Sequence, residues 1–212
     1  MPALFCDVNE TTLDLAPVRE VVDGSLGEGG SGTWFARMLH LSTVNAMVGP
    51  HRPFGELGRA AFLALGGDEA VWPDVVAAFG RLPAYPDVRP GLERFRAAGW
   101  EVFALTNSSP ATVEAGFGGA DVADLFDRRF SVDSVGRFKP APEPYLHALD
   151  ETGVDVGSAW MVACHDWDLA GAADVGMPTA YITRPTVPWA DVYPAPTVTT
   201  DGYEGLADLL LG

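Results

Sequence analysis

Four short apolar runs in the sequence are each followed by polar residues that can do chemistry. The runs lie at 4–6, 102–105, 129–132 and 160–163. The residues that follow them include Asp7, Thr106, Asn107, Lys139, His165 and Asp168. Carboxylate, ammonium, imidazole, hydroxyl and amide groups are the parts from which active sites are assembled. If the four runs end at one place in the fold, the sequence predicts an active site there.

The elements that must position these residues alternate along the chain. The apolar runs lack an in–out alternation, as buried parallel strands do, and a fifth run of this kind lies at 179–182. Helical patterns separate or follow them at 91–98, 110–117, 142–151, 167–175 and 203–211. Such alternation predicts an α/β fold, with a parallel sheet covered by helices on both faces. Ligands of open parallel sheets bind beyond the carboxyl ends of the strands.

Residues 14–87 interrupt this alternation after the first strand. Helical patterns occur there at 33–47, 55–65 and 69–79, without a strand signal between them. We therefore expect a helical cap at 14–87, inserted into a core that consists of residues 1–13 and 88–212.

Composition and charge restrict the partners of the protein. The 212 residues include 48% hydrophobic ones, enough for a folded core, and carry a net charge of −16. Such a field repels nucleic acid and anionic lipid, so we expect neither as a partner. No apolar stretch approaches the ~20 residues that span a bilayer. The first residues do not resemble a signal peptide and the chain has two cysteines, so we expect a cytoplasmic protein.

Four segments, taken in order, resemble the motifs of the haloacid dehalogenase superfamily. They read FCDVNET at 5–11, LTNSS at 105–109, GRFKPAP at 136–142 and HDWDLAGA at 165–172. The likeness extends over nearly the whole chain, and within the superfamily it is nearest to the L-2-haloacid dehalogenases. It implies a Rossmann-like core, a helical cap after strand one, and no metal or other cofactor. It also implies a homodimer.

The resemblance further implies a role for each matching residue. Asp7 is expected to attack carbon, displace halide and form an aspartyl ester that water hydrolyses. Lys139 and Thr11 are expected to hold the Asp7 carboxylate, and Asp168 to help position the hydrolytic water. Val8 and Asn9, through backbone N–H groups, and Thr106 are expected to bind the carboxylate of a small anionic substrate. The remaining substrate contacts are expected from Asn107 at the halide and from Tyr145, Phe54 and Trp167.

Most members of the superfamily transfer phosphoryl groups, which makes a Mg²⁺-dependent phosphatase the main alternative. Phosphatases of this superfamily place a second Asp two residues after the nucleophile as a general acid. The amide of Asn9 stands there and cannot transfer a proton in that way. They also place an acidic Mg²⁺ ligand where this chain has Cys164, a poor ligand for a hard cation. Asp166 or Asp168 can rebuild a metal site, which keeps this alternative open.

The chain also departs from the dehalogenase pattern. Asn9-Glu10 replaces Tyr-Gly, and Ala163 and His165 replace Ser and Asn. The arginine that grips the halide is displaced by one residue to Arg37, with Arg52 as an alternative. These departures leave open a third possibility, a decayed site in a protein with a binding role. At its strand end, His165 is a candidate general base for ester hydrolysis, because imidazole titrates near neutrality.

Overall fold

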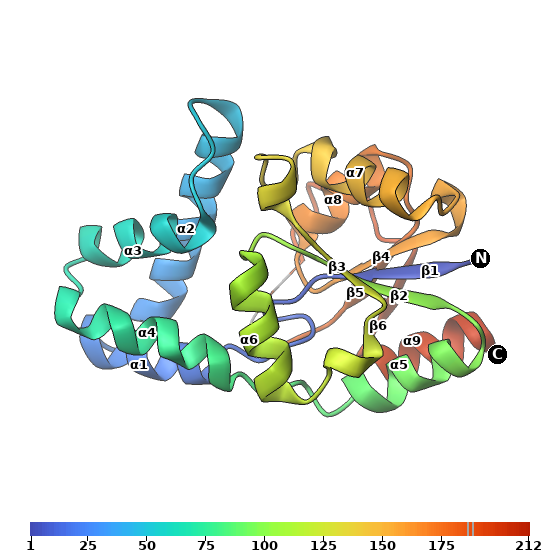
Figure 1. The fold of residues 1–212 in the computed structure, drawn as a ribbon, viewed down its shortest axis with the longest axis horizontal. Coiled ribbons are helices and arrows are strands. Elements are labelled where there is room, and N and C mark those ends of the chain that lie inside the picture. The colour runs from blue at the N-terminus through green and yellow to red at the C-terminus, as the bar shows by residue number, and fades with distance from the viewer. Residues whose placement is uncertain (186, 188) are drawn as a thin grey trace.

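A six-stranded parallel sheet forms the centre of the computed structural model, which describes residues 1–185, 187 and 189–212. The strand order is β3-β2-β1-β4-β5-β6 (Figure 1). The strands are β1 (Ala3–Cys6), β2 (Glu101–Thr106), β3 (Arg128–Ser131), β4 (Ala159–Ala163), β5 (Thr179–Ile182) and β6 (Val198–Thr200). The α/β fold and its five predicted strands are thus confirmed, and β1 lies at the centre between β2 and β4.

The sixth strand was not predicted from the sequence. β6 has three residues, none of them buried, and it follows a proline-containing stretch. Its side chains therefore carry no continuous apolar signal. It pairs with β5 at the edge of the sheet, where Tyr181 lies opposite Thr199.

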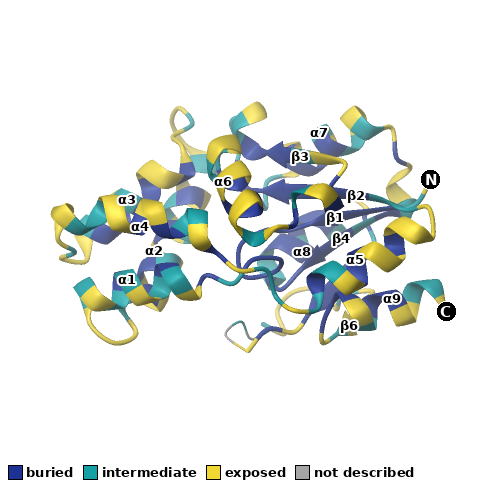
Figure 2. Cartoon of the chain, turned by 60° about the horizontal axis from the view of Figure 1, so that its bottom comes forward, coloured by how far each residue is buried: buried dark blue, intermediate teal, exposed yellow. Residues whose placement is uncertain are grey.

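Helices cover both faces of the sheet because both faces of the central strands are apolar. Leu4 packs in one buried cluster with residues of α5 (Val88–Ala97) and α9 (Tyr203–Leu211). Its neighbour Phe5 packs in another, with residues of α7 (Pro142–Thr152) and α8 (Asp166–Asp174). Figure 2 shows the strands as the buried layer and the outer sides of these helices as exposed. This is the burial pattern of a parallel sheet between two helical layers.

The segment from 14 to 87 is helical, as predicted, apart from a single bridge between Leu13 and Ala84. Its helices are α1 (Ala16–Leu26), α2 (Gly30–Met47), α3 (Phe54–Ala64) and α4 (Trp72–Ala78). In Figure 1 they lie to one side of the sheet, beyond α6 (Pro110–Ala120). The division of the chain into a core and a cap at residues 13/14 and 87/88 stays a prediction.

Helix α1 was missed in the sequence because Pro17 and Gly24 hide its pattern. Pro17 lies in the first turn, where its missing N–H costs no hydrogen bond. Val18 and Val22, four residues apart, supply the buried stripe. None of the helices in the described part of the chain combines the length and hydrophobicity of a membrane-spanning segment.

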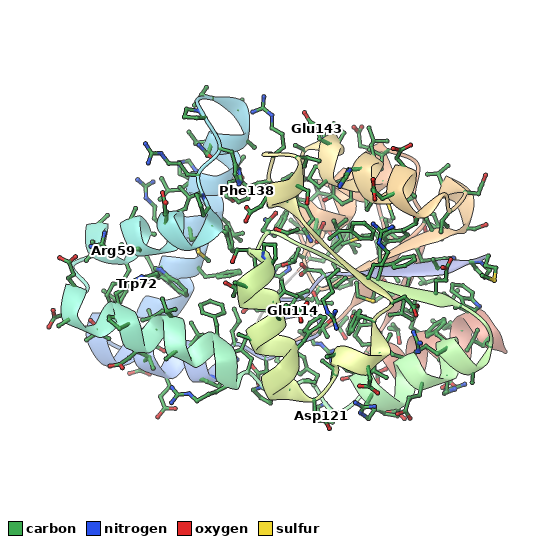
Figure 3. The ribbon with its side chains drawn as sticks, in the orientation of Figure 1. Arg59, Trp72, Glu114, Asp121, Phe138 and Glu143 are labelled. Carbon is green, nitrogen blue, oxygen red and sulfur yellow. The ribbon has the colours of Figure 1, made fainter. Side chains whose placement is uncertain are left out.

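The sheet and the helices α1–α4 meet at the carboxyl ends of the parallel strands. The N-terminus lies at the right of Figure 1, so β1 runs towards the side of the sheet on which α1–α4 lie. Phe138, which follows β3 and is labelled in Figure 3, contacts Phe54 of α3, with 5.7 Å between the ring centroids. Polar residues that follow β1, β2 and β4 therefore lie where the sheet meets the helices α1–α4.

Candidate active site

Asp7 is the residue that directly follows β1, and its carboxylate is buried. Oδ1 accepts a hydrogen bond from Lys139 Nζ at 2.9 Å, and Oδ2 accepts one from Thr11 Oγ1 at 2.9 Å. His165 Nδ1 lies 3.1 Å from Oδ2. The three residues come from different elements, so only the fold brings them to this carboxylate.

Lys139 lies between two carboxylates, although it is 132 positions from Asp7 in sequence. Its ammonium donates to Asp7, to Asp168 Oδ2 at 2.6 Å and to the carbonyl of Leu105 at 2.8 Å. These contacts use all three N–H donors of the group. An ion pair this deep is stabilising only when such contacts are complete, as they are here.

Asp168 is held in turn by Tyr145 and by a close approach of two helices. Tyr145 Oη donates to Asp168 Oδ1 at 2.6 Å. Gly171 allows this approach, because a Cβ at that position would lie 2.6 Å from the carbonyl oxygen of Pro140 and 2.8 Å from Tyr145 Oη. The lack of a side chain at Gly171 thus lets α8 pack against Pro140 and Tyr145.

The charges of this cluster are coupled. Burial raises the pKa of Asp7, but Lys139 and then His165 outweigh it and hold that pKa well below its usual range. Burial lowers the pKa of Lys139, and the two carboxylates raise it to a net value above the ordinary one. The pKa of Asp168 is raised, because burial and the charge of Asp7 outweigh Lys139. Asp7 is therefore an ionised carboxylate beside a protonated lysine.

His165, which follows β4, contacts a second carboxylate that the sequence did not reveal as a site residue. Its Nε2 lies 3.1 Å from Glu10 Oε2, opposite the nitrogen that faces Asp7. Phe35 of α2 and Trp167 of α8 flank the ring, with centroids 6.1 and 5.2 Å away. Burial lowers the pKa of His165, but Cys164, Asp7 and Glu10 raise it to well above the ordinary value.

The amide and hydroxyl residues after β1 and β2 form the wall of the site. Asn9 Nδ2 donates to Ser108 Oγ at 3.2 Å, and Thr106 Oγ1 accepts from the Ser108 N–H. Asn107 Oδ1 accepts from the backbone N–H of Lys139 at 3.0 Å. That bond engages the amide oxygen, and no hydrogen bond of the NH₂ group is found in the described part of the chain.

A small pocket lies over Asp7, with a volume of about 10 Å³, which is the room for one water molecule. Its lining consists of Asp7, Asn9, Phe35, Leu39, Phe54, Thr106, Asn107, His165 and Trp167. Most of the predicted site residues are thus brought together here. Thr11, Lys139, Asp168 and Tyr145 lie beneath the pocket and reach Asp7 directly or through one another.

The two arginines considered for the leaving halide, Arg37 and Arg52, lie outside the pocket. Arg37 is exposed on α2 and does not line the pocket, because a shift of one residue rotates a side chain by roughly 100° about a helix. Phe35 and Leu39 face the pocket in its place. Arg52 is also exposed and lies 3.8 Å from Glu56. The side chain of Val8 belongs to the apolar core, so only its backbone is available to a ligand.

Three residues of the site, Phe35, Leu39 and Glu10, were not predicted from the sequence. Phe35 and Leu39 are four positions apart on α2, a spacing that also describes an ordinary core stripe. Glu10 carried a signal, since it stands where the family pattern has glycine. Its φ of 61° is a left-handed conformation that glycine adopts more readily.

A larger apolar cavity adjoins the pocket. It has a volume of about 310 Å³ and shares Phe54 with the lining of the Asp7 pocket. Trp34, Met38 and Trp72 of the α1–α4 helices form much of its wall, and Trp72 is labelled in Figure 3. Its lining contains no charged residue among those that the structure describes.

Within residues 1–185, 187 and 189–212, no cluster of three or more His, Cys, Asp or Glu side chains has the arrangement of a metal site. The space between the Asp7 and Asp168 carboxylates is taken by the ammonium of Lys139.

Comparison with known proteins identifies the family. The model of the haloacid dehalogenase-like hydrolases matches residues 1–176. (S)-2-haloacid dehalogenase 4A of Burkholderia cepacia is 28% identical over 167 residues, which cover 76% of this chain and 72% of that protein. (S)-2-haloacid dehalogenase of Xanthobacter autotrophicus is 28% identical over 191 residues, covering 86% and 75%. A solved structure of a dehalogenase has a TM-score of 0.90 at 25% identity and covers 100% of this chain and 98% of its own.

The superfamily resemblance of the four motifs is thereby confirmed. All four fall within the matched residues, and the sheet carries their polar residues to one edge. Since the family model spans most of its 212 residues, this chain belongs to the haloacid dehalogenase-like hydrolases.

Proposed function

We propose that this hydrolase cleaves the carbon–halogen bond of small 2-haloalkanoic acids, without a metal ion and through an aspartyl ester on Asp7. The observation that carries the proposal is the buried ion pair of Asp7 with Lys139. It keeps the nucleophile ionised with a cation that the chain itself supplies. The names of the relatives, (S)-2-haloacid dehalogenases, supply the substrate class.

The first half-reaction is a displacement at carbon. Oδ1 of Asp7 accepts one hydrogen bond within the described part of the chain, whereas Oδ2 faces both Thr11 and His165. A carboxylate oxygen has about two lone-pair sites, so Oδ1 keeps one for the attack. Oδ1 forms the new bond to carbon, and the electron pair of the carbon–halogen bond leaves with the halide.

The substrate carboxylate has a candidate cradle beside Asp7. The backbone N–H groups of Val8 and Asn9 donate to no other group in the described part of the chain. The hydroxyl proton of Thr106 is available as well, because its oxygen acts as acceptor for Ser108. Free N–H donors at a strand end bind an anion that the −16 charge of the protein would otherwise repel.

Two of the predicted roles change with the geometry. Both oxygens of Asp168 are engaged, by Lys139 and Tyr145, and its side chain is fully buried. We therefore assign Asp168 to holding Lys139 rather than to holding water. At the leaving group, the NH₂ end of Asn107 and the ring of Trp167 replace Arg37, which lies outside the pocket.

The phosphatase alternative is disfavoured by the same contacts. Asn9 donates to Ser108 and has no acidic proton for a leaving alkoxide. Binding without catalysis has no contact in its favour, because the nucleophile, the lysine and the threonine are all in place.

The cellular setting also remains a proposal. We expect a cytoplasmic protein, which agrees with the two buried, unpaired cysteines Cys6 and Cys164. We expect small anionic substrates, no nucleic acid or membrane partner, and a homodimer. Light scattering on the purified protein tests the last point.

A substrate panel tests the reaction. Purified protein is offered 2-haloalkanoic acids and phosphate esters, each with EDTA or with Mg²⁺. We expect halide release that survives EDTA, and none from Asp7→Asn, since an amide is a poor nucleophile. Phosphate release that requires Mg²⁺ would support the phosphatase instead, and absence of both activities would leave a binding role.

Isotope labelling then tests the covalent step. A single turnover is run in ¹⁸O-water with enzyme in excess. We expect ¹⁸O in the Asp7 carboxylate and not in the hydroxy-acid product, because the product oxygen comes from Asp7. Label in the product would show direct attack of water on the substrate.

A further inference from the structure

Glu10 and His165 both depart from the family pattern, and the fold puts them in contact. Glu10 Oε2 lies 3.1 Å from His165 Nε2, and His165 Nδ1 lies 3.1 Å from Asp7 Oδ2. Both side chains are buried. Glu10 adopts its left-handed φ of 61° at a position where glycine would be unstrained. The backbone at Glu10 is thus strained, and the side-chain carboxylate of Glu10 contacts the imidazole of His165.

We infer that Glu10 is a positioning residue, which holds His165 with Nδ1 towards Asp7 so that His165 takes the proton of the water that hydrolyses the ester. This inference rests on the proposed function. A carboxylate on one imidazole nitrogen fixes the ring and the tautomer, and leaves the other nitrogen as the base. Asp168, the other carboxylate near the nucleophile, is fully engaged by Lys139 and Tyr145.

The charges around His165 make the base dependent on the first half-reaction. The titratable groups that face it are Asp7 and Glu10 after β1, Cys164 and Asp166 beside it in the chain, and Tyr181 of β5. Arg19 reaches Glu10 from α1 at 3.4 Å, while Phe35 of α2 and Trp167 of α8 bring no charge. In the free enzyme, imidazolium is the form that donates to both carboxylates.

Formation of the ester removes one of those two charges. An alkylated Asp7 is neutral and no longer favours the imidazolium, so His165 loses its proton to solvent more readily. The neutral ring, held through Nε2–H by Glu10, then presents the lone pair of Nδ1. His165 becomes a base only after there is an ester to hydrolyse.

The second half-reaction balances as follows. Water attacks Cγ of the Asp7 ester, and Nδ1 takes one proton of that water. The bond between Cγ and the alkyl oxygen then breaks, and its electron pair leaves with the oxygen of the hydroxy acid. The imidazolium returns the proton to that oxygen. The second proton of the water stays on the Asp7 carboxyl group, which contains one oxygen from water. Transfer of this proton to His165 regenerates the Asp7 carboxylate and the imidazolium of the free enzyme.

Kinetics of Glu10→Gly separate this role from a structural one. The variant removes the carboxylate and also the backbone strain, so misfolding does not explain a loss of activity. We expect a rapid burst of one halide per enzyme molecule, followed by steady-state turnover reduced about 100-fold. Mass spectrometry should find Asp7 esterified during the slow phase. Glu56→Gln, an exposed carboxylate of α3, is the matched control and should keep wild-type kinetics.

The pH profile and NMR provide readouts that do not depend on rate alone. In Glu10→Gly, the acid limb of the steady-state profile should move to lower pH, since the imidazolium loses a carboxylate partner. Glu10→Asp should restore part of the wild-type profile. In NMR of the free protein, His165 should titrate at lower pH in Glu10→Gly than in wild type, with His165→Asn identifying its signal.

The outcomes distinguish this inference from the proposed function. If wild type releases halide but Glu10→Gly loses the burst and the steady state together, the positioning role is wrong and the function stands. An unchanged His165 titration in Glu10→Gly also overturns the role. If wild type releases no halide from any 2-haloacid, the function fails and the hydrolytic role of the pair fails with it.

Discussion

The two hollows at the junction of sheet and helices differ in nearly every physical respect. The pocket over Asp7 has room for one water molecule and lies on a network of paired charges. The neighbouring cavity holds about 310 Å³ and is lined by aromatic and aliphatic side chains with a few hydroxyls. The contacts of the first region hold its charged side chains in place. The second region offers apolar space with few polar groups that could orient a ligand. In this fold the paired charged groups and the larger apolar space therefore lie in two separate, neighbouring regions.

Loss of Lys139 should damage the charged region most. In Lys139→Met the carboxylates of Asp7 and Asp168 face each other without the ammonium between them, and Asp7 keeps only His165 as a cationic partner, so the pKa of Asp7 rises. We expect a loss of about 3–5 kcal/mol in the free energy of unfolding, as for other broken buried ion pairs. Halide release should fall by about 1000-fold or more, since the nucleophile is no longer ionised. Urea denaturation and a halide assay measure the two effects.

A double variant checks the cause. If the unpaired charge is responsible, adding Asp7→Asn to Lys139→Met should recover part of the lost stability. No recovery would mean that packing of the lysine side chain, and not its charge, holds this region together.

Gly171→Ala tests how tightly the charged region is built. The added Cβ would approach the Pro140 carbonyl and Tyr145, so α8 must move and carry Asp168 away from Lys139. We expect a loss of about 1–3 kcal/mol in stability and roughly a tenfold loss of activity. Gly118→Ala in α6 is the control, because its Cβ would meet nothing within 4 Å, and it should be neutral or slightly stabilising. Equal behaviour of the two variants would contradict the close-packing argument.

The stability of the charged region should depend on alkaline pH through His165. Burial lowers the pKa of His165 and Cys164, Asp7 and Glu10 raise it, to a net value well above 6.5. The group therefore contributes its full stabilisation below pH 6.5, and this contribution is lost as the pH rises through the raised pKa. Each unit by which the pKa is raised corresponds to about 1.4 kcal/mol.

Denaturation curves between pH 6 and pH 10 measure this dependence. His165→Asn should remove that part of the slope, while His40→Asn, on the exposed side of α2, should leave it in place. A slope that survives in His165→Asn would assign it to another group.

Phe54 separates the two regions, and its replacement should join them. Phe54→Leu opens the shared wall, so a longer alkyl chain can reach the apolar cavity. We expect the ratio of kcat/KM for a six-carbon 2-haloacid over haloacetate to rise about tenfold, the value of roughly two buried methylenes. Val76 lines the cavity but not the Asp7 pocket, so Val76→Ala widens the cavity without opening the shared wall. It should leave the ratio of kcat/KM values within about twofold.

Arg37 should matter least. Its side chain is exposed and does not line the pocket, so Arg37→Ala should keep kcat/KM within about twofold. A loss of more than tenfold would mean that α2 rotates on substrate binding and brings Arg37 to the leaving group.

The sequence predicted much of the fold and most of the pocket, for identifiable reasons. Buried strands such as the one ending at Asp7 are continuous apolar runs, which local sequence records. Helix α1 and strand β6 were not predicted, because Pro17 and Gly24 obscure the former and the latter is short and exposed. Arg37 was placed at the site from its approximate position, whereas a helix requires the register to be correct to one residue.

What the sequence by itself determined was the set of reacting groups and the strand ends that carry them. The order of the motifs and the apolar runs fixed Asp7, Lys139 and the residues after the second strand, because both signals are local. Only the tertiary structure decided which groups touch. In the fold, Asp168 contacts Lys139 and Tyr145, and Arg37 is exposed to solvent. Glu10 contacts His165, although the two are 155 positions apart in sequence. Contacts at such separations depend on strand order and helix rotation, which no local pattern of residues encodes.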